Sequence, residues 1–143
     1  METQPLIMER TYNATAARVW DAITDSSKMR EWYFDIKSFK PEVGFNFSFL
    51  CVMDGMDYLH LCEVTEVVPG KKLTHSWRYD GFEGNSFVTF ELFPEGNTTR
   101  LVLTHRGIES FPASAEFTRG SFTEGWTEIL GKSLKDYVEG VEA

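Results

Sequence analysis

Several side chains that could do chemistry stand at alternating positions in stretches typical of β-strands. His75, Trp77 and Tyr79 are spaced two residues apart, so they should project from one face of a strand, and His105 ends another alternating stretch. A histidine among aromatic rings can donate to a ligand oxygen or act as a general base, since desolvation and neighbouring groups shift its pKa. It can also be a core histidine satisfied by a backbone carbonyl or a water, and we favour this interpretation.

The orientation of Glu63 bears on whether the chain is an enzyme. A carboxyl group that pointed inward beside Trp77 could share acid–base work with His75, whereas an outward one would only be solvated. A register error of one residue reverses the faces of the stretch from Tyr58 to Val68, so the sequence leaves this orientation open, with the outward one favoured. An enzyme using His75 with Glu63 or Tyr79 is therefore an alternative, and no residue is assigned as catalytic.

Metal and nucleotide cofactors are not predicted. His60, His75 and His105 fall on three separate predicted strands, and the sequence has no His-x-His, no His-Glu-x-x-His and no cysteine pair at metal-binding spacing. The Gly81-Phe-Glu-Gly84 segment has neither the spacing of a dinucleotide-binding loop nor a following Lys-Ser or Lys-Thr. The sequence thus predicts no metal site and no cofactor.

Charge and hydropathy exclude other classes of partner. The formal charge is −8, the pI is about 4.9 and no basic cluster is present, so we do not expect nucleic-acid binding. No apolar run is long enough for a membrane span, and the N-terminus lacks the features of a signal peptide, which predicts a cytoplasmic protein. Cys51 and Cys62 are expected to be free thiols in a reducing compartment, although a disulfide between them stays open.

The elements that must position these side chains can be placed along one domain, residues 1–143. The stretch Leu6 to Tyr12 has strand character, and a short helix should follow a cap near Thr15 and end near Thr24. Asp25 can cap a second short helix, on which Met29 and Trp32 share a face. Two small helices are therefore predicted after the first strand.

A strongly aromatic sheet follows. Aromatic residues make up 15% of the chain, and from Phe45 onward the apolar residues alternate. Turn signals at Asp54-Gly55, Pro69-Gly70, 80–85 and 94–97 divide the rest into five antiparallel strands. Pairing about these turns predicts one apolar inner face, made by Leu73, His75, Trp77, Tyr79, Ser86, Val88, Phe90, Leu92, Leu101, Leu103 and His105. The opposite face, which carries Thr74, Ser76, Arg78 and Thr104, should meet water.

A long amphipathic helix is predicted from Phe117 to Val141. Its apolar residues recur at three- and four-residue spacings, and only this stripe is large enough to cover the inner face of the sheet. Gly125, beside Trp126, is expected to let the helix approach the sheet closely.

Short signatures along the chain carry a resemblance to a known family. They are Val19-Trp20 with Asp25, Met29-x-x-Trp32, Glu63 to Pro69 followed by Leu73-x-x-x-Trp77, Thr99-x-Leu101-x-Leu103 with His105-Arg106-Gly107, and Gly125-Trp126. In order and spacing the chain resembles the activator of heat-shock protein 90 ATPase homologue-like family, within the START-like (SRPBCC) superfamily. The resemblance implies an α+β helix-grip fold, in which an antiparallel sheet wraps around a long C-terminal helix, and a cavity between sheet and helix that can hold a small apolar molecule. It also implies two alternatives: a chaperone-associated interaction module of the stress response, and a cyclase- or dehydratase-like enzyme using His75.

The leading hypothesis is a binding domain for a small hydrophobic or aromatic ligand. The aromatic rings can line a pocket or fill a solid core, and the residues alone leave this open. Tyr33 and Phe34 lie where related folds have a cavity entrance, and the exposed edge of the Phe45 strand allows a monomer or a weak homodimer. The candidate ligand-binding residues are Trp32, Phe47, Phe49, His75, Trp77, Phe90, Leu103, Trp126 and Leu130.

Overall fold

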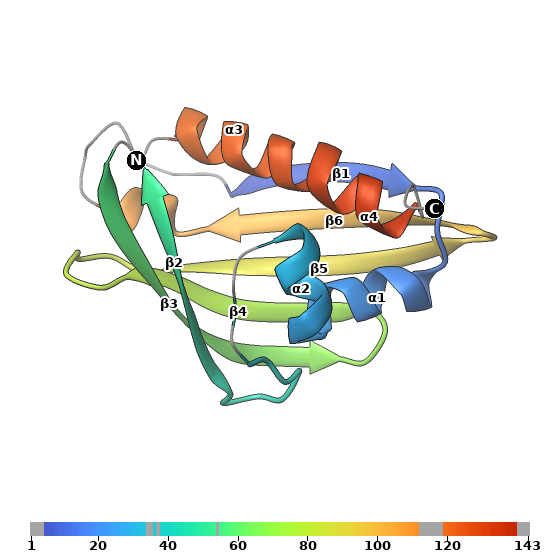
Figure 1. Ribbon diagram of the computed structural model, residues 1–143, viewed down its shortest axis with the longest axis horizontal. Helices are drawn as coiled ribbons and strands as arrows, with labels where there is room; N and C mark the ends of the chain where they lie inside the picture. Colours follow the sequence, from blue (N-terminus) through green and yellow to red (C-terminus); the bar gives the residue numbers. More distant parts are fainter. Residues whose placement is uncertain (1–4, 34–35, 37, 54, 112–118, 140–143) are drawn as a thin grey trace.

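The protein is an antiparallel six-stranded sheet that holds a long C-terminal helix on one of its faces (Figure 1). The computed structural model describes residues 5–33, 36, 38–53, 55–111 and 119–139. The strand order is β1-β6-β5-β4-β3-β2, so β1 and β2 are the two edges. The predicted helix-grip α+β fold is confirmed. The strands are β1 (Leu6–Tyr12), β2 (Asn46–Met53), β3 (Met56–Val68), β4 (Lys72–Tyr79), β5 (Ser86–Glu95) and β6 (Thr98–Arg106).

The hairpin connecting β5 to β6 is tighter than the sequence suggests. Pro94 pairs with Thr99 and Glu95 with Thr98, so only Gly96 and Asn97 form the turn, instead of the four residues predicted. Proline has no backbone N–H to donate to a neighbouring strand, and near the end of a strand fewer such hydrogen bonds are lost.

The hairpin of β2 and β3 runs at a steep angle to β5 and β6 (Figure 1). The register between β3 and β4 shifts between Val64 and Glu66, which inserts one extra residue into β3. A bulge of this kind bends its strand and increases the local twist. The sheet therefore curls around the helix instead of lying flat beneath it.

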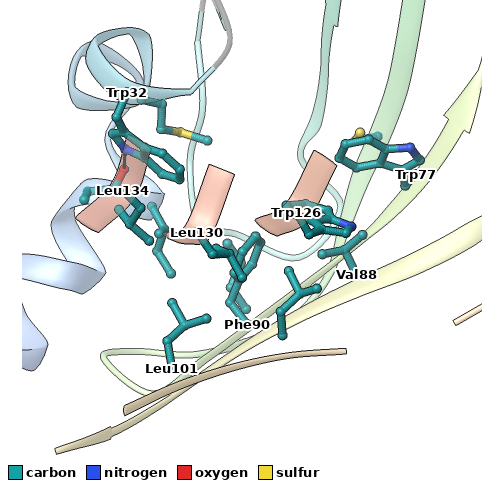
Figure 2. Close-up of a cluster of buried hydrophobic side chains, with 14 of the residues drawn as sticks. Trp32, Trp77, Val88, Phe90, Leu101, Trp126, Leu130 and Leu134 are labelled. Carbon is teal, nitrogen blue, oxygen red and sulfur yellow. Dashed lines mark hydrogen bonds between the residues drawn. The ribbon is translucent and has the colours of Figure 1, made fainter. Parts of the chain in front are cut away.

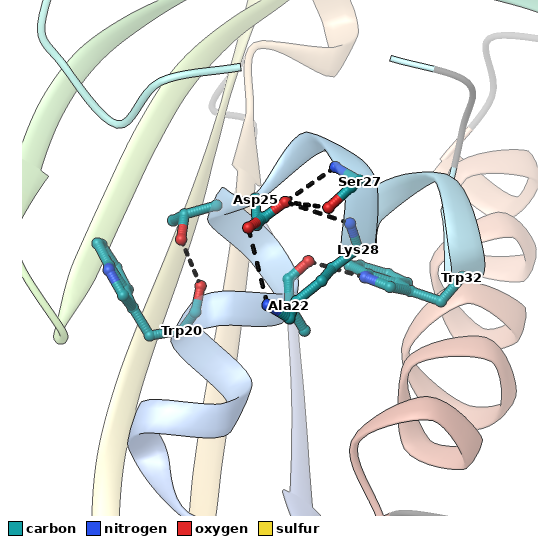
Figure 3. A network of polar contacts seen from close by, with 7 residues as sticks. Trp20, Ala22, Asp25, Ser27, Lys28 and Trp32 are labelled. Carbon is teal, nitrogen blue, oxygen red and sulfur yellow. Dashed lines mark hydrogen bonds and ion pairs between the residues drawn. The ribbon is translucent and has the colours of Figure 1, made fainter. Parts of the chain in front are cut away.

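The two short helices begin where cap residues were predicted. In α1 (Ala16–Thr24), the Thr15 hydroxyl accepts a hydrogen bond from the Arg18 backbone N–H at 3.3 Å. In α2 (Ser26–Trp32), the Asp25 carboxylate accepts from the backbone N–H groups of Ser27 and Lys28 at 2.9 and 3.4 Å (Figure 3). The side-chain hydrogen bond from Ser27 is the largest influence that lowers the pKa of Asp25. Both caps satisfy amide groups that have no partner inside the helix.

The C-terminal helix contains a π turn that keeps its apolar stripe straight. It comprises α3 (Arg119–Glu128), the π turn η3 (Ile129–Leu134) and α4 (Lys135–Val138). Its buried residues are spaced strictly by four: Phe122, Trp126, Leu130, Leu134 and Val138. At 3.6 residues per turn such a stripe drifts by about 40° at each step. The wider π turn offsets this drift, so all five side chains face the sheet.

Tyr12 supports the π turn from β1. Its hydroxyl donates to the carbonyl of Leu130 at 2.8 Å, inside the core. A π turn disturbs the regular pairing of helix carbonyls, so an outside donor at this carbonyl stabilises the irregularity. Burial raises the pKa of the Tyr12 phenol, which therefore stays protonated and able to donate.

The core lies between the inner face of the sheet and the helix (Figure 2). In the close-up, Trp77, Val88, Phe90 and Leu101 of the sheet face Trp126, Leu130 and Leu134 of the helix. Every residue assigned to the inner face from the sequence is buried, as predicted. The outer face departs from the prediction at Thr74. That residue is buried, and its hydroxyl is satisfied by pairing with that of Thr89 at 2.9 Å.

Candidate binding site between the sheet and the C-terminal helix

Trp77, near the C-terminal end of β4, is the centre of a cluster of aromatic rings. Its ring centroid lies 5.6 Å from that of Phe49, 4.9 Å from His60, 5.7 Å from His105 and 5.4 Å from Trp126. Tilted and edge-to-face arrangements of this kind are the favourable ones for aromatic pairs. The cluster joins four strands to the C-terminal helix and forms one wall of the interior.

A directed chain of hydrogen bonds crosses this cluster. The Trp126 indole N–H donates to Nδ1 of His105 at 3.1 Å, and Nε2 of His105 lies 2.8 Å from the Ser86 hydroxyl. The indole can only donate, so Nδ1 must be the acceptor, and the proton of the neutral ring is on Nε2. Nε2–H therefore donates to Ser86, whose hydroxyl donates to the Trp77 carbonyl at 2.8 Å. Burial lowers the pKa of His105 to about 3, so the ring stays neutral.

The proximity of Ser86 and His105 does not make a nucleophilic pair. In a catalytic triad the third residue accepts from the histidine, so that Nε2 is free to take the serine proton. Here Trp126 donates to that ring, Nε2 already carries a proton, and the hydroxyl of Ser86 is directed at a carbonyl. The arrangement joins the helix to the sheet without activating the serine.

His75 is the second buried histidine of the inner face. Its Nδ1 donates to the backbone carbonyl of Ser76 at 2.8 Å, so in the neutral ring Nε2 has no hydrogen and is an acceptor. Burial lowers the pKa of His75 to about 4, although the bond to the Ser76 carbonyl opposes this shift. The ring is therefore neutral at pH 7. The favoured interpretation, a core histidine satisfied by a backbone carbonyl, holds for one of its two nitrogens.

An internal cavity of about 10 Å³ lies beside His75. A volume of roughly 10–15 Å³ on this scale is what a single water needs. This cavity beside His75 therefore has room for no more than one water. The residues that line the cavity are Ile23, Met29, Trp32, Tyr33, Phe39, Leu73, His75 and Phe90.

The third histidine, His60, also points inward, and its strand fixes the orientation of Glu63. His60 pairs with Phe49 of β2, and their rings stack at 4.4 Å. Nδ1 of His60 donates to the Tyr58 carbonyl at 3.0 Å, and burial lowers its pKa to about 4. Glu63, an odd number of residues away, is exposed on the opposite face. It cannot share a proton with His75, which removes that pair from the enzyme alternative.

Tyr79 does not complete an acid–base pair with His75 either. Its hydroxyl accepts a hydrogen bond from the Trp77 indole at 2.9 Å. Tyr79 lies four residues from His75 along β4, which is about 13 Å on an extended strand. Burial raises the pKa of Tyr79 well above the neutral range, so its phenol is not a base at pH 7.

The two cysteines cannot form a disulfide with each other in this register. Cys51 is opposite Tyr58, and Cys62 is opposite Phe47, so the two thiols are offset by four residues along the hairpin. This offset is about 13 Å, whereas a disulfide needs Cα atoms within about 7 Å. Both are free, and burial raises the pKa of each thiol.

The structure buries all nine predicted ligand-binding residues but brings only three of them to the cavity. Trp32, His75 and Phe90 line it. The other six pack elsewhere in the core: Phe47, Phe49, Trp77, Leu103, Trp126 and Leu130. Of the predicted entrance, Tyr33 lines the cavity, and Phe34 lies outside the described residues.

The sequence carried signals for some of the missed lining residues. Leu73 is two residues before His75 on the same face of β4, and Met29 shares a face of α2 with Trp32. Phe39 lies in the segment between α2 and β2, where no periodicity indicates a direction.

A wide groove lies outside the cavity, between α2 and the C-terminal helix. Its volume is about 830 Å³, and Trp32 lines both this groove and the internal cavity. The Trp32 indole N–H donates to the Ala22 carbonyl at 2.8 Å (Figure 3). This bond holds the ring that lines both spaces. The residues that line the outer groove are Arg18, Ser27, Lys28, Glu31, Trp32, Lys132, Ser133, Asp136 and Tyr137.

The described residues form neither a metal site nor a membrane span. No group of three or more His, Cys, Asp or Glu side chains is placed to hold a metal ion there. Likewise, none of the helices in those ranges has the length and apolar character required to cross a membrane.

Comparison with family models gives one match that spans most of the chain. The model described as Activator of Hsp90 ATPase homolog 1-like protein matches residues 13–139. The chain belongs to this family. The resemblance carried by the sequence signatures is thereby confirmed. At the level of the Activator of Hsp90 ATPase homolog 1-like family, the fold and its aromatic cluster support a ligand-binding domain.

Solved structures with the same fold cover nearly all of the chain. Protein CV1439 from Chromobacterium violaceum is 21% identical with a TM-score of 0.81, and the match covers 95% of this chain and 97% of that one. CalU16 from Micromonospora echinospora is 27% identical with a TM-score of 0.73, covering 97% and 76%. DynU16, a putative protein in the dynemicin biosynthetic locus, is 20% identical with a TM-score of 0.79, covering 99% of this chain and 49% of DynU16. No curated protein is significantly similar to this sequence.

Proposed function

We propose that this protein is a binding domain for a small hydrophobic or aromatic ligand, held between the sheet and the C-terminal helix. The observation that carries the proposal is the wall of the internal cavity. The lining residues are apolar or aromatic apart from His75, whose ring is neutral and has Nε2 as an acceptor, and the aromatic residues Tyr33 and Trp32 each carry one polar group. Ligand sites are mostly apolar with a few polar groups that fix orientation.

The chemistry of the wall defines the class of ligand. Phe90, Leu73 and Ile23 suit an aromatic or alicyclic body, and Nε2 of His75 suits a ligand hydroxyl or N–H. The low pKa of His75 keeps Nε2 unprotonated at pH 7, so it accepts instead of donating. A ligand with one donor group on an apolar body meets both requirements.

Binding must be coupled to opening of the cavity, since its volume of about 10 Å³ holds no ligand. Met29 is flexible and adapts readily to a new packing, and Trp32 forms the boundary with the outer groove. The affinity measured in solution is the intrinsic affinity multiplied by the fraction of molecules that are open. Ligands that stabilise the fold should therefore bind more weakly than their contacts alone would indicate.

We place this binding in the cytoplasm and assign the domain no catalytic step. The free thiols of Cys51 and Cys62 fit a reducing compartment. The exposed position of Glu63 leaves His75 without a carboxylate partner from β3.

Isothermal titration calorimetry with a matched pair of compounds tests the proposal. We expect 2-naphthol to bind saturably and more tightly than 2-methoxynaphthalene, because only the naphthol donates to His75. His75→Phe should abolish this preference, while Glu63→Gln, on the outer face, should retain it. A circular dichroism melt confirms that each variant is folded. Absence of saturable binding of either compound to the wild-type chain contradicts the proposal.

A chaperone-associated role is the second candidate. The family description names an activator of Hsp90 ATPase, and an exposed apolar pair lies on the outer face of the β2–β3 hairpin. Leu50 and Leu59 are direct partners there, with exposed fractions of 53% and 36%. Exposed apolar side chains that adjoin one another can mark a protein contact.

The test of this candidate is the ATPase rate of Hsp90 with the domain added. The role requires a change in that rate, which Leu50→Ser with Leu59→Ser removes. An unchanged rate with the wild-type domain rules the role out.

A further inference from the structure

We propose that the groove between α2 and the C-terminal helix binds the anionic head group of an amphiphilic ligand whose apolar body occupies the internal cavity. We further propose that Trp32 closes the passage between these two spaces. The inference rests on the proposed function and adds the class of ligand and its direction of entry.

The first observation is that one side chain separates the two spaces. Trp32 lines the internal cavity together with His75 and Phe90, and it lines the groove together with Lys28 and Lys132. Rotation of this ring would therefore join a pocket of apolar side chains to a polar groove open to solvent. A molecule spanning both would have an apolar end and a polar end.

The second observation is the set of contacts that hold the Trp32 ring, which is buried at 7% exposure. A hydrogen bond to the Ala22 carbonyl at 2.8 Å and stacking on Tyr33 at a centroid distance of 4.8 Å fix its position. A neutral hydrogen bond contributes about 0.5–1.5 kcal/mol net, and an aromatic pair contributes a similar amount. Rotation of the ring also gives up part of its apolar burial, so the apolar body of the ligand must replace those contacts.

The third observation is the sign of the charges in the groove. Three of its five charged side chains are cationic, in a chain with a formal charge of −8. Most of the surface therefore disfavours an anion, whereas this groove does not. The five side chains are Arg18, Lys28 and Lys132, with Glu31 and Asp136.

The cations differ in their availability. Arg18 already donates to the carbonyls of Val138 and Tyr137, so it positions the end of α4. Lys28 pairs with Asp25 at 3.7 Å and Lys132 with Asp136 at 3.3 Å. The Lys28 and Lys132 side chains are 41% and 68% exposed, and exposed ion pairs contribute only about 0–1 kcal/mol. Each lysine can exchange its carboxylate for a ligand anion at low cost.

The two lysines come from opposite walls, Lys28 from α2 and Lys132 from the π turn. An anion between them would be contacted from both sides, with the Ser27 and Ser133 hydroxyls also in the lining. The ligand class that fits is a compact aromatic body bearing one carboxylate or sulfonate, with a hydroxyl or N–H on the body for His75. A volume of about 830 Å³ exceeds what such a head group needs, so size does not exclude it.

A pair of fluorescent probes separates the head group from the body. 1-Anilinonaphthalene-8-sulfonate and N-phenyl-1-naphthylamine share the aromatic body and its N–H, and they differ in the sulfonate. We expect the sulfonate to bind more tightly than the neutral probe at low salt and to lose this advantage as salt is added. The double variant Lys28→Gln, Lys132→Gln should weaken the sulfonate about 3- to 20-fold and leave the neutral probe unchanged.

Two further variants keep the test specific. Lys135→Gln removes an exposed lysine of the same helix that is absent from the groove lining, and it should change neither affinity. Trp32→Phe removes the hydrogen bond to Ala22 and puts a smaller ring between the groove and the cavity. Both probes should therefore associate at least threefold faster in stopped-flow experiments.

The outcomes distinguish failure of the head-group inference from failure of the proposed function. Equal affinity of the two probes, or equal losses in the Lys135 and double-lysine variants, overturns the head-group inference while the proposed function stands. An unchanged association rate in Trp32→Phe overturns the role of Trp32 as the closing residue. If neither probe binds the folded wild-type chain, the proposed function fails and the inference fails with it.

Discussion

The indole N–H of Trp126 donates to Nδ1 of His105 at 3.1 Å, and this one contact fixes both a helix and a tautomer. It anchors α3 to β6 inside the core. It also requires the proton of His105 to be on Nε2, which directs the Ser86 hydroxyl to the Trp77 carbonyl. Each hydrogen bond in this chain therefore has its donor on the side of the helix and its acceptor on the side of β4.

Trp126→Phe should destabilise the protein by about 1–3 kcal/mol more than the loss of ring size alone, because a buried acceptor on His105 loses its donor. The free energy of unfolding in urea measures the effect. Trp20→Phe is the control, since Trp20 is a half-buried side chain of α1 remote from the chain of hydrogen bonds. Equal losses in the two variants would show that the hydrogen bond contributes nothing beyond ring size.

Tyr12→Phe should loosen the π turn. The variant removes the donor to the Leu130 carbonyl, which costs about 1–2 kcal/mol at a buried site. Hydrogen exchange should quicken at the amides of 129–135 more than in α1. Tyr137→Phe, a half-buried tyrosine of α4, provides the comparison. Unchanged protection of the π turn in Tyr12→Phe would mean that the tyrosine does not support it.

Stability should fall as the pH is lowered from about 6.5 towards 4. Histidines of the unfolded chain have a pKa of about 6.5. In the folded protein burial lowers the pKa to about 4 for His60 and His75 and about 3 for His105. The unfolded state binds more protons in this window, so the free energy of unfolding decreases as the pH falls, by about 2 kcal/mol per histidine between pH 7 and 5.

Urea midpoints at pH 7.5, 6 and 5 measure this slope. His60→Phe replaces one titrating ring with a ring that stacks equally well on Phe49, and its stability should depend less steeply on pH. A wild-type midpoint that is constant from pH 7.5 to 5 would contradict the buried neutral state of the three histidines.

The sequence predicted the sheet well because the turn residues and the alternation agreed with each other. Pairing about the loop 80–85 places His75 and Val88 on the same face of neighbouring strands, and in the structure the two residues are direct partners. The orientation of β3 was left open, although the same reasoning applied to the two-residue turn at Asp54-Gly55 places His60 opposite Phe49. Glu63 then follows as an outward residue.

Other features could not be predicted because they depend on tertiary contacts. The stripe from Phe122 to Val138 indicates a helix, but the π turn within it also depends on the Tyr12 hydroxyl from a distant strand. Gly125 was expected to allow close approach and does not. It is exposed, and a Cβ atom there would meet nothing within 4 Å.

Some of the residues that line the candidate site could be predicted from the sequence, but the volume of the cavity could not. Trp32, His75 and Phe90 were named from the sequence and meet at the cavity. Whether rings leave a space or fill it depends on how their edges and faces interlock, which residue spacing does not encode.

A long-range ¹H–¹⁵N spectrum of the histidine rings during titration with 2-naphthol is the most direct test of the proposed function. We predict that Nε2 of His75 shifts and saturates with the ligand, because it accepts the naphthol hydroxyl at the cavity wall. The nitrogens of His105, both already hydrogen-bonded, should move much less. Saturable binding that leaves His75 Nε2 unshifted, or no binding at all, would contradict a ligand site between the sheet and the C-terminal helix.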